Sequence, residues 1–279
     1  MLMDPAEAMA LSAQRVAARG RLVAGLREGR TRLVRLHQDG AAKIRMPAVA
    51  DGPLEAILIN TAGGLTGDDR VAWQVEAEAG ASVTVTTQAC EKLYRAGAGH
   101  AEVTATLTAG EGARIAWLPQ ETIVFNNSAF VRRLDVDLAD GAEALILEAT
   151  VFGRLAMRET VERASFHDRW RIVRGGRLVH AEDFALGPEV AATLARNAVT
   201  GGSIAVATLL LVAADAEALL ADARHIIGKD GGASAWTVAG TGKLLARLVA
   251  RDSYLLRQRL APLVGLLNGQ AGLPKVWSL

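Results

Sequence analysis

Between residue 54 and about residue 185, one short segment after another has the pattern of a β-strand. These segments are rich in Val, Thr, Ile and Leu, and in several of them apolar and polar residues alternate with the two-residue period of half-buried strands. The pattern predicts a protein body built mainly of strands. The clearest segments are 71–78, 81–87, 101–109, 131–138 and 143–149.

A Gly-Ala dipeptide recurs at turns that end one of these strands and precede the next. It occurs at Gly80-Ala81, Gly112-Ala113 and Gly141-Ala142, with spacings of 32 and 29 residues. A period near 30 residues is typical of stacked or solenoid-like all-β architectures, in which each unit buries its face against the next. The repeat is loose, so an irregular β-sandwich with similar hairpins is an equal alternative.

Helical spacing of apolar residues is found mainly near the end of the chain. Asp215 is suited to cap a helix over 216–227, which Gly228 would end. The segment 241–267 is expected to form a longer helix that Pro262 kinks or restarts.

Two short strands are expected between and before these helices, at 203–213 and 234–240. The predicted fold class is therefore mainly β, with stacked, β-helical-like sheets, a small α/β part and two helices near the C-terminus. The expected organisation is a mobile tail over residues 1–20 and a single domain over 21–279. Within that domain the β body runs to about 200 and the α/β part covers about 203–267, with a soft boundary at 187–202.

Composition excludes several classes of protein. Hydrophobic residues make up 51% and charged residues 22%, which is typical of a globular chain. The net charge is +1, so the chain lacks the basic excess of most nucleic-acid-binding proteins. The longest apolar run, 204–214, is shorter than the roughly 20 residues that a membrane helix needs. Asp4 and Glu7 precede any apolar stretch, unlike in a secretory signal, and a cytoplasmic location is expected.

The usual catalytic motifs are incomplete. GTGKL at 240–244 has the Gly-Lys pair of a phosphate loop but lacks its first glycine and its Ser/Thr. There is no GxSxG segment, and the five histidines form no HxH or HExxH pair. Cys90 is the only cysteine, so no internal disulfide or CxxC metal site can form.

The segment 59–70, INTAGGLTGDDR, is dense in turn-forming residues. Gly63, Gly64 and Gly67 indicate a backbone that turns tightly or is closely approached. Asp68 and Asp69 could share a proton, hold a hard cation, or cap a turn. From their spacing alone, turn capping is the favoured interpretation.

Three further dense segments lie at 86–99, 117–133 and 147–159. They place carboxylates on or beside strands whose other residues are typical of a core. Such a charge has to be paired, cap a loop or line a wet cavity. These carboxylates are Glu91, Glu121 and Glu148.

Together these segments resemble the urease accessory protein UreD family, called UreH in some organisms. The resemblance rests on NTAGGLTGDDR, TTQACEKLYR, WLPQETIVF, the ExxVFGRxAM stretch at 148–157 and PKVW at 274–277, in the family's order and spacing. It covers roughly residues 55 to 277. This chain departs from the family pattern at Asp68, where a second glycine is common, at Met157-Arg158-Glu159, where FGR is usually followed by a Gly-Glu, and at Lys275, where arginine is usual.

The resemblance implies a non-catalytic role. Proteins similar to UreD bind the urease apoenzyme and dock UreF, which recruits the GTPase UreG, and the assembly delivers nickel to urease. The family fold is mostly β, stacked in a helical manner, with two helices. No tightly bound cofactor is implied, only a transient nickel ion, and no nucleic acid or membrane partner is expected.

The family's proposed nickel route is an internal tunnel, and acids within the matching segments are our candidates for lining it. The alternative for each is a surface ion pair with a nearby Lys or Arg. Cys90 could be a soft nickel ligand, but a small buried residue is favoured. The candidate route residues are Asp69, Glu91, Glu148, Thr150, Glu182 and Asp183.

Tyr94, Arg95 and Trp277 are the candidate partner contacts, because these residue types dominate interfaces. Trp277 could equally be a packing anchor. Two other classes stay open: a β-solenoid hydrolase that uses carboxylates such as Asp68, Asp69 and Glu148, and a structural β-protein that assembles with its own copies.

Overall fold

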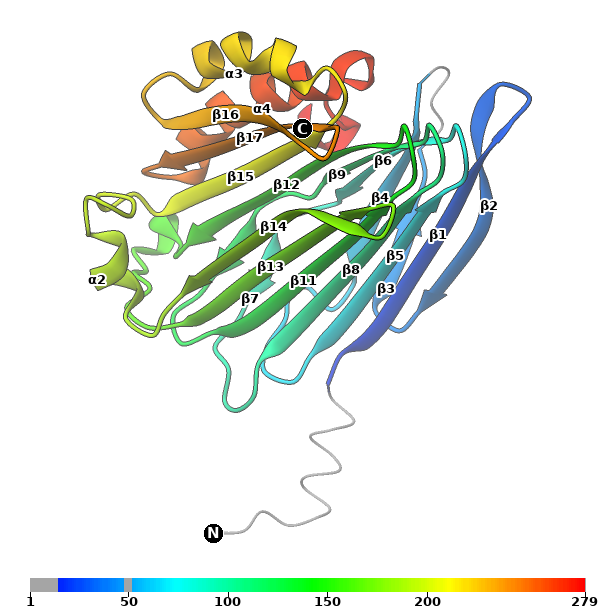
Figure 1. The fold of residues 1–279 in the computed structure, drawn as a ribbon. Coiled ribbons are helices and arrows are strands. Elements are labelled where there is room, and N and C mark those ends of the chain that lie inside the picture. Colours follow the sequence, from blue (N-terminus) through cyan, green and yellow to red (C-terminus); the bar gives the residue numbers. More distant parts are fainter. Residues whose placement is uncertain (1–14, 48–51, 279) are drawn as a thin grey trace.

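The computed structural model describes residues 15–47 and 52–278. Two β-sheets face each other, and helices cover the outer face of one of them (Figure 1). The first sheet has the strand order β14-β13-β11-β8-β5-β1-β2. Its strands are β1 (Ala17–Arg27), β2 (Arg30–Asp39), β5 (Arg70–Ala77), β8 (Ala101–Ala109), β11 (Ala129–Leu138), β13 (Ser165–Arg174) and β14 (Arg177–Leu186).

The second sheet has the order β16-β17-β15-β12-β9-β6-β4-β3, with β10 pairing to β12 and to β7. Because β7 and β10 continue the paths of β6 and β9 after short breaks, they extend this sheet at one end. Its strands are β3 (Ala42–Arg45), β4 (Leu54–Asn60), β6 (Ser82–Thr87), β7 (Glu91–Leu93), β9 (Arg114–Leu118), β10 (Thr122–Val124), β12 (Glu143–Phe152), β15 (Ala205–Val212), β16 (Gly231–Val238) and β17 (Thr241–Ala250).

The helices are few and mostly follow the strands in sequence. α3 and α4 pack against each other on the outer face of the second sheet. The helical elements are η1 (Leu155–Met157), α2 (Val190–Leu194), η2 (Ala216–Leu219), α3 (Leu220–Ile227), α4 (Ser253–Asn268), η3 (Gly269–Ala271) and η4 (Lys275–Ser278). No helix within 15–47 or 52–278 is long and apolar enough to cross a membrane.

The stacked architecture is confirmed, and its repeat unit is the one that the Gly-Ala turns predict. The chain passes from a strand of the first sheet to a strand of the second and back, so β5, β8 and β11 lie parallel in one sheet and β6, β9 and β12 in the other. Val71 pairs with Val103, which pairs with Arg132, reproducing the spacings of 32 and 29 residues.

The Gly-Ala turns stack because the two residues of each dipeptide have different roles. Gly80, Gly112 and Gly141 have φ values of 68°, 62° and 68°, where a side chain is disfavoured. The alanine that follows each glycine is at most 1% exposed. The small methyl group fits where successive turns approach one another, and glycine allows the chain to reverse.

Two hydrophobic layers hold the fold together. One lies between the two sheets, and the other lies between the second sheet and the helices α3 and α4. β12 contributes to both layers: Ile146 faces the first sheet and Leu147 faces the helices. This two-sided burial explains why the sequence of β12 is a nearly continuous apolar run rather than an alternating one.

The prediction of one long helix over 241–267 was wrong. Residues 241–250 form the strand β17, and the helix α4 starts only at Ser253, where the carboxylate of Asp252 accepts a hydrogen bond from the Leu255 amide at 2.8 Å. β17 is paired along both edges, with β15 and with β16, and it contributes apolar side chains to both hydrophobic layers, so its apolar residues fit a helical period as well as a strand. Pro262 lies inside α4.

Other C-terminal predictions were confirmed with small changes. The buried strand at 203–213 is β15, and 216–227 forms η2 followed by α3, which ends at Gly228 with φ 61°. The side chain of Asp215 makes no capping hydrogen bond, contrary to its predicted role. The whole of β15 pairs with β12, so the α/β part continues the second sheet.

The predicted tail falls mostly on residues 1–14, which lie outside the described residues. β1 already begins at Ala17 and pairs with β5, so the tail prediction was wrong for residues 17–20.

Candidate functional site

Three charged side chains lie deep between the two sheets. Arg132, Glu148 and Asp168 are only 5%, 5% and 4% exposed, although their neighbours on the same strand faces are apolar. They come from β11, β12 and β13, and each occupies an inward position of its strand's alternation. Burial of this kind requires that the charges satisfy one another.

Arg132 holds the two carboxylates together. Its Nε and Nη2 donate to the two oxygens of Asp168 at 3.0 and 2.7 Å, a bidentate contact. Its Nη1 lies 2.5 Å from Glu148 Oε2 and donates to the hydroxyl of Thr122 at 3.1 Å. One guanidinium therefore joins strands of both sheets.

Aromatic side chains complete the cluster. Trp117 donates its indole N–H to Glu148 Oε1 at 2.9 Å, and Trp170 donates to Asp168 Oδ1 at 3.1 Å. The guanidinium carbon of Arg132 lies 5.9 Å from the ring centres of Phe130 and Phe166. These contacts fix the geometry and exclude water from much of the cluster.

The cluster carries two acids for one base, and this imbalance affects protonation. Burial raises the pKa of Glu148 to about 7, and the charge of Asp168 adds to this, while Arg132 acts in the opposite direction. Burial also acts to lower the pKa of Arg132, but the charges of Asp168 and Glu148 outweigh it and raise that pKa. Arg132 therefore stays charged, and Glu148 is the group whose charge is most easily lost.

A row of polar residues leads from this cluster toward β7. Thr122 on β10 is paired with Thr150 on β12 and with Glu91 on β7, so the three side chains share one face of the sheet. The carboxylate of Glu91 accepts from Asn60 Nδ2 at 3.2 Å. Burial raises the pKa of Glu91 to about 7.

A second row leads in the opposite direction, toward β14. Glu148 is paired with Thr208 on β15, which is paired with Arg247 on β17. Arg247 Nη2 reaches Glu182 Oε2 on β14 at 2.6 Å, which joins the edge strand of the first sheet to the strand next to the edge of the second. Arg247 is largely exposed, so this row ends at the surface.

We refer to the two rows with the central cluster as the polar stripe, which comprises Glu91, Thr122, Arg132, Glu148, Thr150, Asp168, Glu182, Thr208 and Arg247.

The structure thus brings together four of the six candidate route residues, Glu91, Glu148, Thr150 and Glu182. Asp69 is also buried, near enough to Glu91 for its charge to add to the rise in the pKa of Glu91, but its own hydrogen bonds hold a turn in place. Its two carboxylate oxygens accept the backbone N–H groups of Val16 and Thr66, each at 2.8 Å. These bonds match the turn-capping interpretation of this acid pair.

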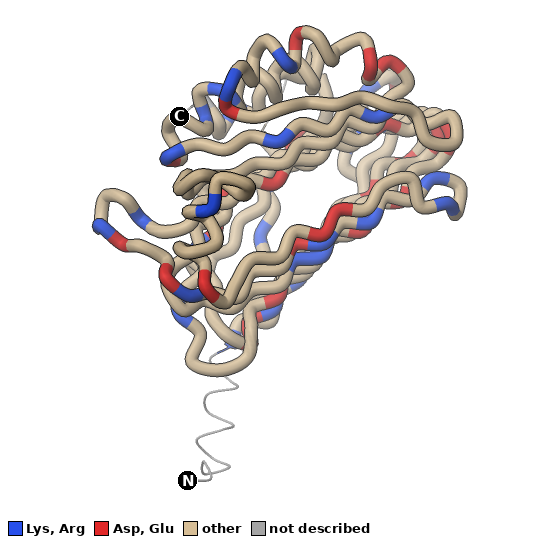
Figure 2. Tube along the Cα trace, turned by 60° about the vertical axis from the view of Figure 1, so that its left-hand side comes forward, with Lys and Arg blue, Asp and Glu red and all other residues tan. Residues whose placement is uncertain are grey.

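Asp183 lies on the opposite face of β14 from Glu182. It is half exposed and contacts His167 at 2.6 Å and Arg171 at 3.5 Å. This outer face carries many such pairs, and Figure 2 shows acidic and basic positions side by side along the strands of the first sheet. The contacts of Asp183 therefore match the alternative of a surface ion pair.

The turn glycines have distinct structural requirements. Gly63 and Gly64 have φ values of 78° and 150°, whereas Gly67 is confined because a Cβ there would lie 1.8 Å from the carbonyl oxygen of Ala98. Asp68 occupies the left-handed region with φ 67°, which accounts for the glycine common at this position in the family pattern.

Sequence reasoning missed Arg132, Asp168 and Thr122, although a signal was present. Phe130, Leu134 and Val136 define the inward phase of β11, and Arg132 occupies the same phase. Asp168 does the same on β13. A charged residue at an apolar phase of a strand was therefore the detectable signal.

Cys90 is half-buried and belongs to a second group of polar side chains, outside the polar stripe. Its thiol lies 3.4 Å from Glu121 Oε2, and Arg257 of α4 binds both oxygens of Glu121 at 2.7 Å. Burial alone would raise the pKa of Glu121, but the hydrogen bonds and charge of Arg257 outweigh it, and the pKa is lowered. Burial raises the pKa of Cys90 to about 12, with the Glu121 charge acting in the same direction.

We expect the Cys90 thiol to react slowly with iodoacetamide, because only the thiolate is nucleophilic. At pH 8 the raised pKa corresponds to a rate roughly a hundredfold to a thousandfold below that of an unshifted cysteine. Mass spectrometry can follow the reaction cleanly, because the chain has one cysteine. The same chain unfolded in urea is the control, and equal rates in the folded and unfolded chains would contradict the prediction.

Of the three residues predicted to contact a partner, two lie on the surface and one is buried. Tyr94 and Arg95 are exposed. Trp277 is 8% exposed, donates to Thr86 Oγ1 at 3.1 Å and lies 5.5 Å from the guanidinium carbon of Arg257. The burial of Trp277 thus matches the alternative role, in which it anchors the C-terminal segment by packing.

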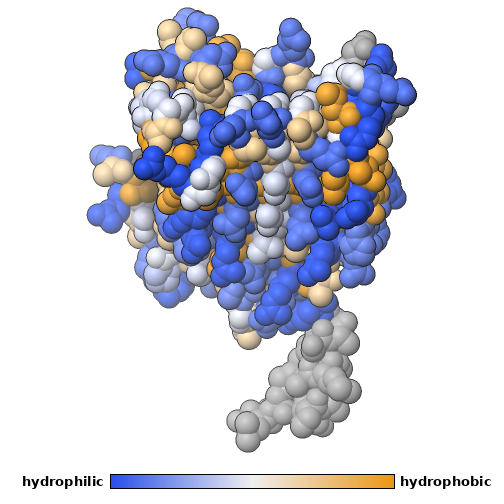
Figure 3. All heavy atoms as spheres, turned by 45° about the vertical axis from the view of Figure 1, so that its right-hand side comes forward, coloured by the Kyte–Doolittle hydropathy of each residue, from blue (hydrophilic) through white to orange (hydrophobic). Residues whose placement is uncertain are grey.

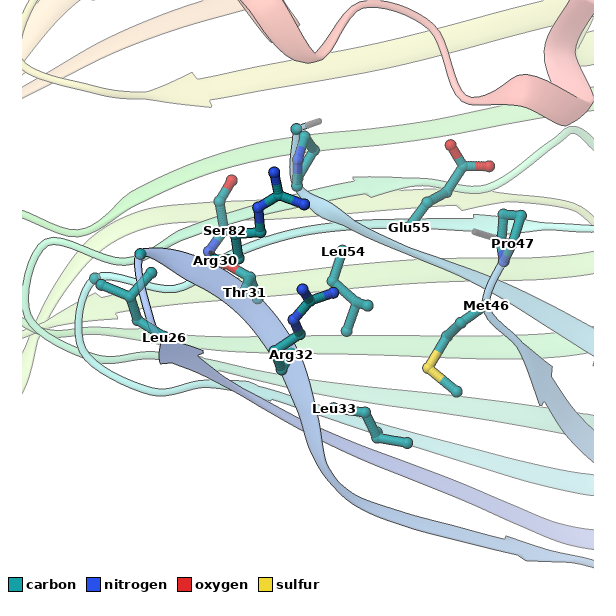
Figure 4. A pocket seen from close by; sticks show the side chains of 14 residues that line it. Leu26, Arg30, Thr31, Arg32, Leu33, Met46, Pro47, Leu54, Glu55 and Ser82 are labelled. Carbon is teal, nitrogen blue, oxygen red and sulfur yellow. Dashed lines mark hydrogen bonds between the residues drawn. The ribbon is translucent and has the colours of Figure 1, made fainter. Parts of the chain in front are cut away.

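A cavity of about 690 Å³ lies elsewhere and contains none of the candidate residues. It is situated between the start of β2 and the beginning of β4. Arg30, Arg32, Leu33 and Leu54 line it (Figure 4). Figure 3, which brings this side of the molecule forward, shows apolar side chains among a mostly hydrophilic surface.

No group of three or more His, Cys, Asp and Glu side chains within 15–47 and 52–278 has the arrangement of a metal-binding cluster. The polar stripe is therefore a series of single carboxylates and hydroxyls rather than a closed coordination site.

Comparison with known proteins gives a consistent result. Residues 16–278 match the profile of a family described as UreD urease accessory protein. A protein named urease accessory protein UreD from Mesorhizobium japonicum is 64% identical over 267 residues, covering 96% of this chain and 95% of that protein. Urease accessory protein UreD 1 of Brucella abortus is 58% identical over 269 residues, with 96% of each chain covered. The protein of the same name from Brucella anthropi is 57% identical over 272 residues, again with 96% coverage of each.

Proposed function

This chain belongs to the UreD family of urease accessory proteins, and from that premise we propose that it is a maturation scaffold for urease. In this role it binds the urease apoenzyme and docks UreF, through which the GTPase UreG is recruited for nickel insertion. The observation that carries the proposal is the family match over residues 16–278, since it spans both sheets and the C-terminal helices. The chain itself performs no hydrolysis in this proposal.

Nickel is the cargo of this assembly, and the polar stripe is our proposed path for it. Carboxylate and hydroxyl oxygens bind nickel more weakly than imidazole or thiolate, and a cation in transit has to leave each site. Glu91, Glu148 and Glu182 supply carboxylates along the stripe, and Thr150 supplies a hydroxyl.

Arg132 determines how a cation would pass the middle of the stripe. Its Nη1 lies 2.5 Å from Oε2 of Glu148, an oxygen for which the described residues supply no hydrogen bond, so a divalent cation at that oxygen has to displace the guanidinium. Arg132 would keep its bidentate contact with Asp168 after it has left Glu148. In this proposal the arginine holds the path closed when no cation is present.

A deletion and rescue tests the scaffold role. Urease from cells that lack this protein and grow with nickel is expected to be inactive and poor in nickel, because no accessory scaffold brings the metal to the apoenzyme. The wild-type chain should restore both properties. Urease activity and the nickel content of purified urease are the two measurements. Fully active, nickel-loaded urease in the deletion strain would refute the proposal.

A further inference from the structure

A second cavity, of about 590 Å³, opens between η1 and the start of α4. Its wall includes the apolar side chains of Ile123, Val151 and Ile204. Polar groups of the Cys90 group, among them Glu121 and Arg257, lie on another side of it. They are already bonded to one another, so the unoccupied part of this cavity is suited to an apolar group.

The three most exposed large apolar side chains of the described residues lie on this cavity or within two residues of the segments that line it. Tyr254, Met157 and Leu155 are 70%, 68% and 59% exposed, and Leu255 is 40% exposed. Leu155 lines the cavity directly, and Tyr254 follows Ser253, which also lines it. Exposed apolar groups gathered around a hollow indicate a protein-binding site.

The same surface extends to Tyr94. The ring of Tyr94 packs edge-on against Phe125 at 5.1 Å between ring centres, and the guanidinium of Arg154 lies 4.0 Å from the centre of the Phe125 ring. Arg154 also lines the cavity. We name this area the α4–η1 surface and define it by Tyr94, Leu155, Met157, Tyr254 and Leu255.

The charges around the α4–η1 surface are mainly positive. Arg158 and Arg251 are exposed and form no ion pair with any other described residue. The nearby acids are already used: Glu159 pairs with Arg154 at 2.6 Å, and Asp252 caps α4. A complementary surface would therefore present carboxylates around an apolar centre.

We propose that the α4–η1 surface binds a protein partner that inserts an apolar side chain into the cavity and places carboxylates against Arg158 and Arg251. The inference rests on the proposed function, because the partner is sought among the proteins of urease maturation. Exposed Tyr, Met and Leu around a pocket, with free arginines beside them, have the composition of an interface centre with a charged rim.

The double variant Leu155→Asp/Tyr254→Asp tests the apolar part of this interface. The purified full-length chain is immobilised, and urease apoenzyme and UreF are each applied separately as probes in biolayer interferometry. The affinity for one of the two is expected to fall about 100-fold, because two side chains at an interface centre are lost and charge is added. Leu178→Asp, which changes a half-exposed leucine on β14, is the matched control and should bind as the wild type does.

The variant Arg158→Glu tests the charged rim of the proposed interface. If the double variant does not fold, this variant alone still tests whether the α4–η1 surface binds a partner. Its association rate with the same probe should fall about tenfold at low salt, and the salt dependence should become weaker. Circular dichroism and thermal melting of each variant show whether the fold is intact.

Wild-type affinity of both variants for both probes would overturn the inference. If these variants also restore urease activity in the deletion strain, the proposed function stands while the surface assignment fails. Failure of the wild-type chain to restore urease would instead refute the proposed function. Self-association that the variants abolish in sedimentation experiments, with both probes still bound, would show that the occupant is a second copy and overturn the partner assignment.

Discussion

Replacing Arg132 with Leu is expected to lower the free energy of unfolding by about 3–5 kcal/mol, because the carboxylates of Glu148 and Asp168 would be left buried without their common partner. The substitution removes two carboxylate contacts and the bond to Thr122 in a single step. Urea unfolding followed by circular dichroism measures the loss. A protein of marginal stability would also show poor soluble expression.

The neighbouring residue offers a matched control. Arg133 lies on the opposite face of β11, is half exposed, and pairs with Glu102 on the surface. Arg133→Ala should change the free energy of unfolding by less than about 1 kcal/mol, since solvent already screens that pair. Similar effects of the two substitutions would show that the buried cluster does not support the fold as described.

The second large effect concerns urease activation. Glu148→Gln is expected to lower the activity of matured urease by roughly tenfold or more while the complex with the apoenzyme still assembles, because the carboxylate that would receive the cation is gone. The amide oxygen can still accept from Trp117, with the amide nitrogen then next to Arg132, which keeps its bidentate contact with Asp168. Removing one of two acids that share one arginine also relieves the excess negative charge, so the fold should remain stable.

Urease activity, nickel content and co-purification of the complex are the measurements for this variant. Asp183→Asn is the control, because Asp183 lies on the outer face of β14 and outside the polar stripe. Normal activation by Glu148→Gln would remove Glu148 from the path. Loss of assembly would show instead that the residue supports the interface or the fold.

Local signals predicted much of the fold from sequence. Alternating residues identified β5, β6, β8 and β11, since a strand with one buried face leaves a two-residue period, and an apolar run identified β12, which is buried on both faces. The Gly-Ala turns indicated the repeat length but left a stacked fold and an irregular β-sandwich equally open, and the family resemblance implied the stacked fold. The structure shows why the dipeptide recurs, since glycine adopts the positive φ of these turns without cost and the small alanine is buried beside it. The family resemblance added the function, which no periodicity could supply.

The same local signals failed at β17. Its residues 241–250 satisfy a helical period, and only pairing with β15 and β16 selects the strand. Such a choice depends on neighbours that are distant in sequence, so tertiary packing overrides the local preference. Trp277 is a similar case, since its burial against Thr86 depends on where the C-terminal segment crosses the second sheet.

The sequence by itself thus determined that the fold is mainly β, the length of its repeat and the family, because each depends on short-range pattern or on matching segments. Tertiary structure alone decided which charges meet. Arg132, Glu148 and Asp168 lie on three strands of two sheets, and only the register of those strands places one guanidinium between two carboxylates. It also directed Glu182 inward and Asp183 outward, because adjacent residues of a strand face opposite sides of the sheet.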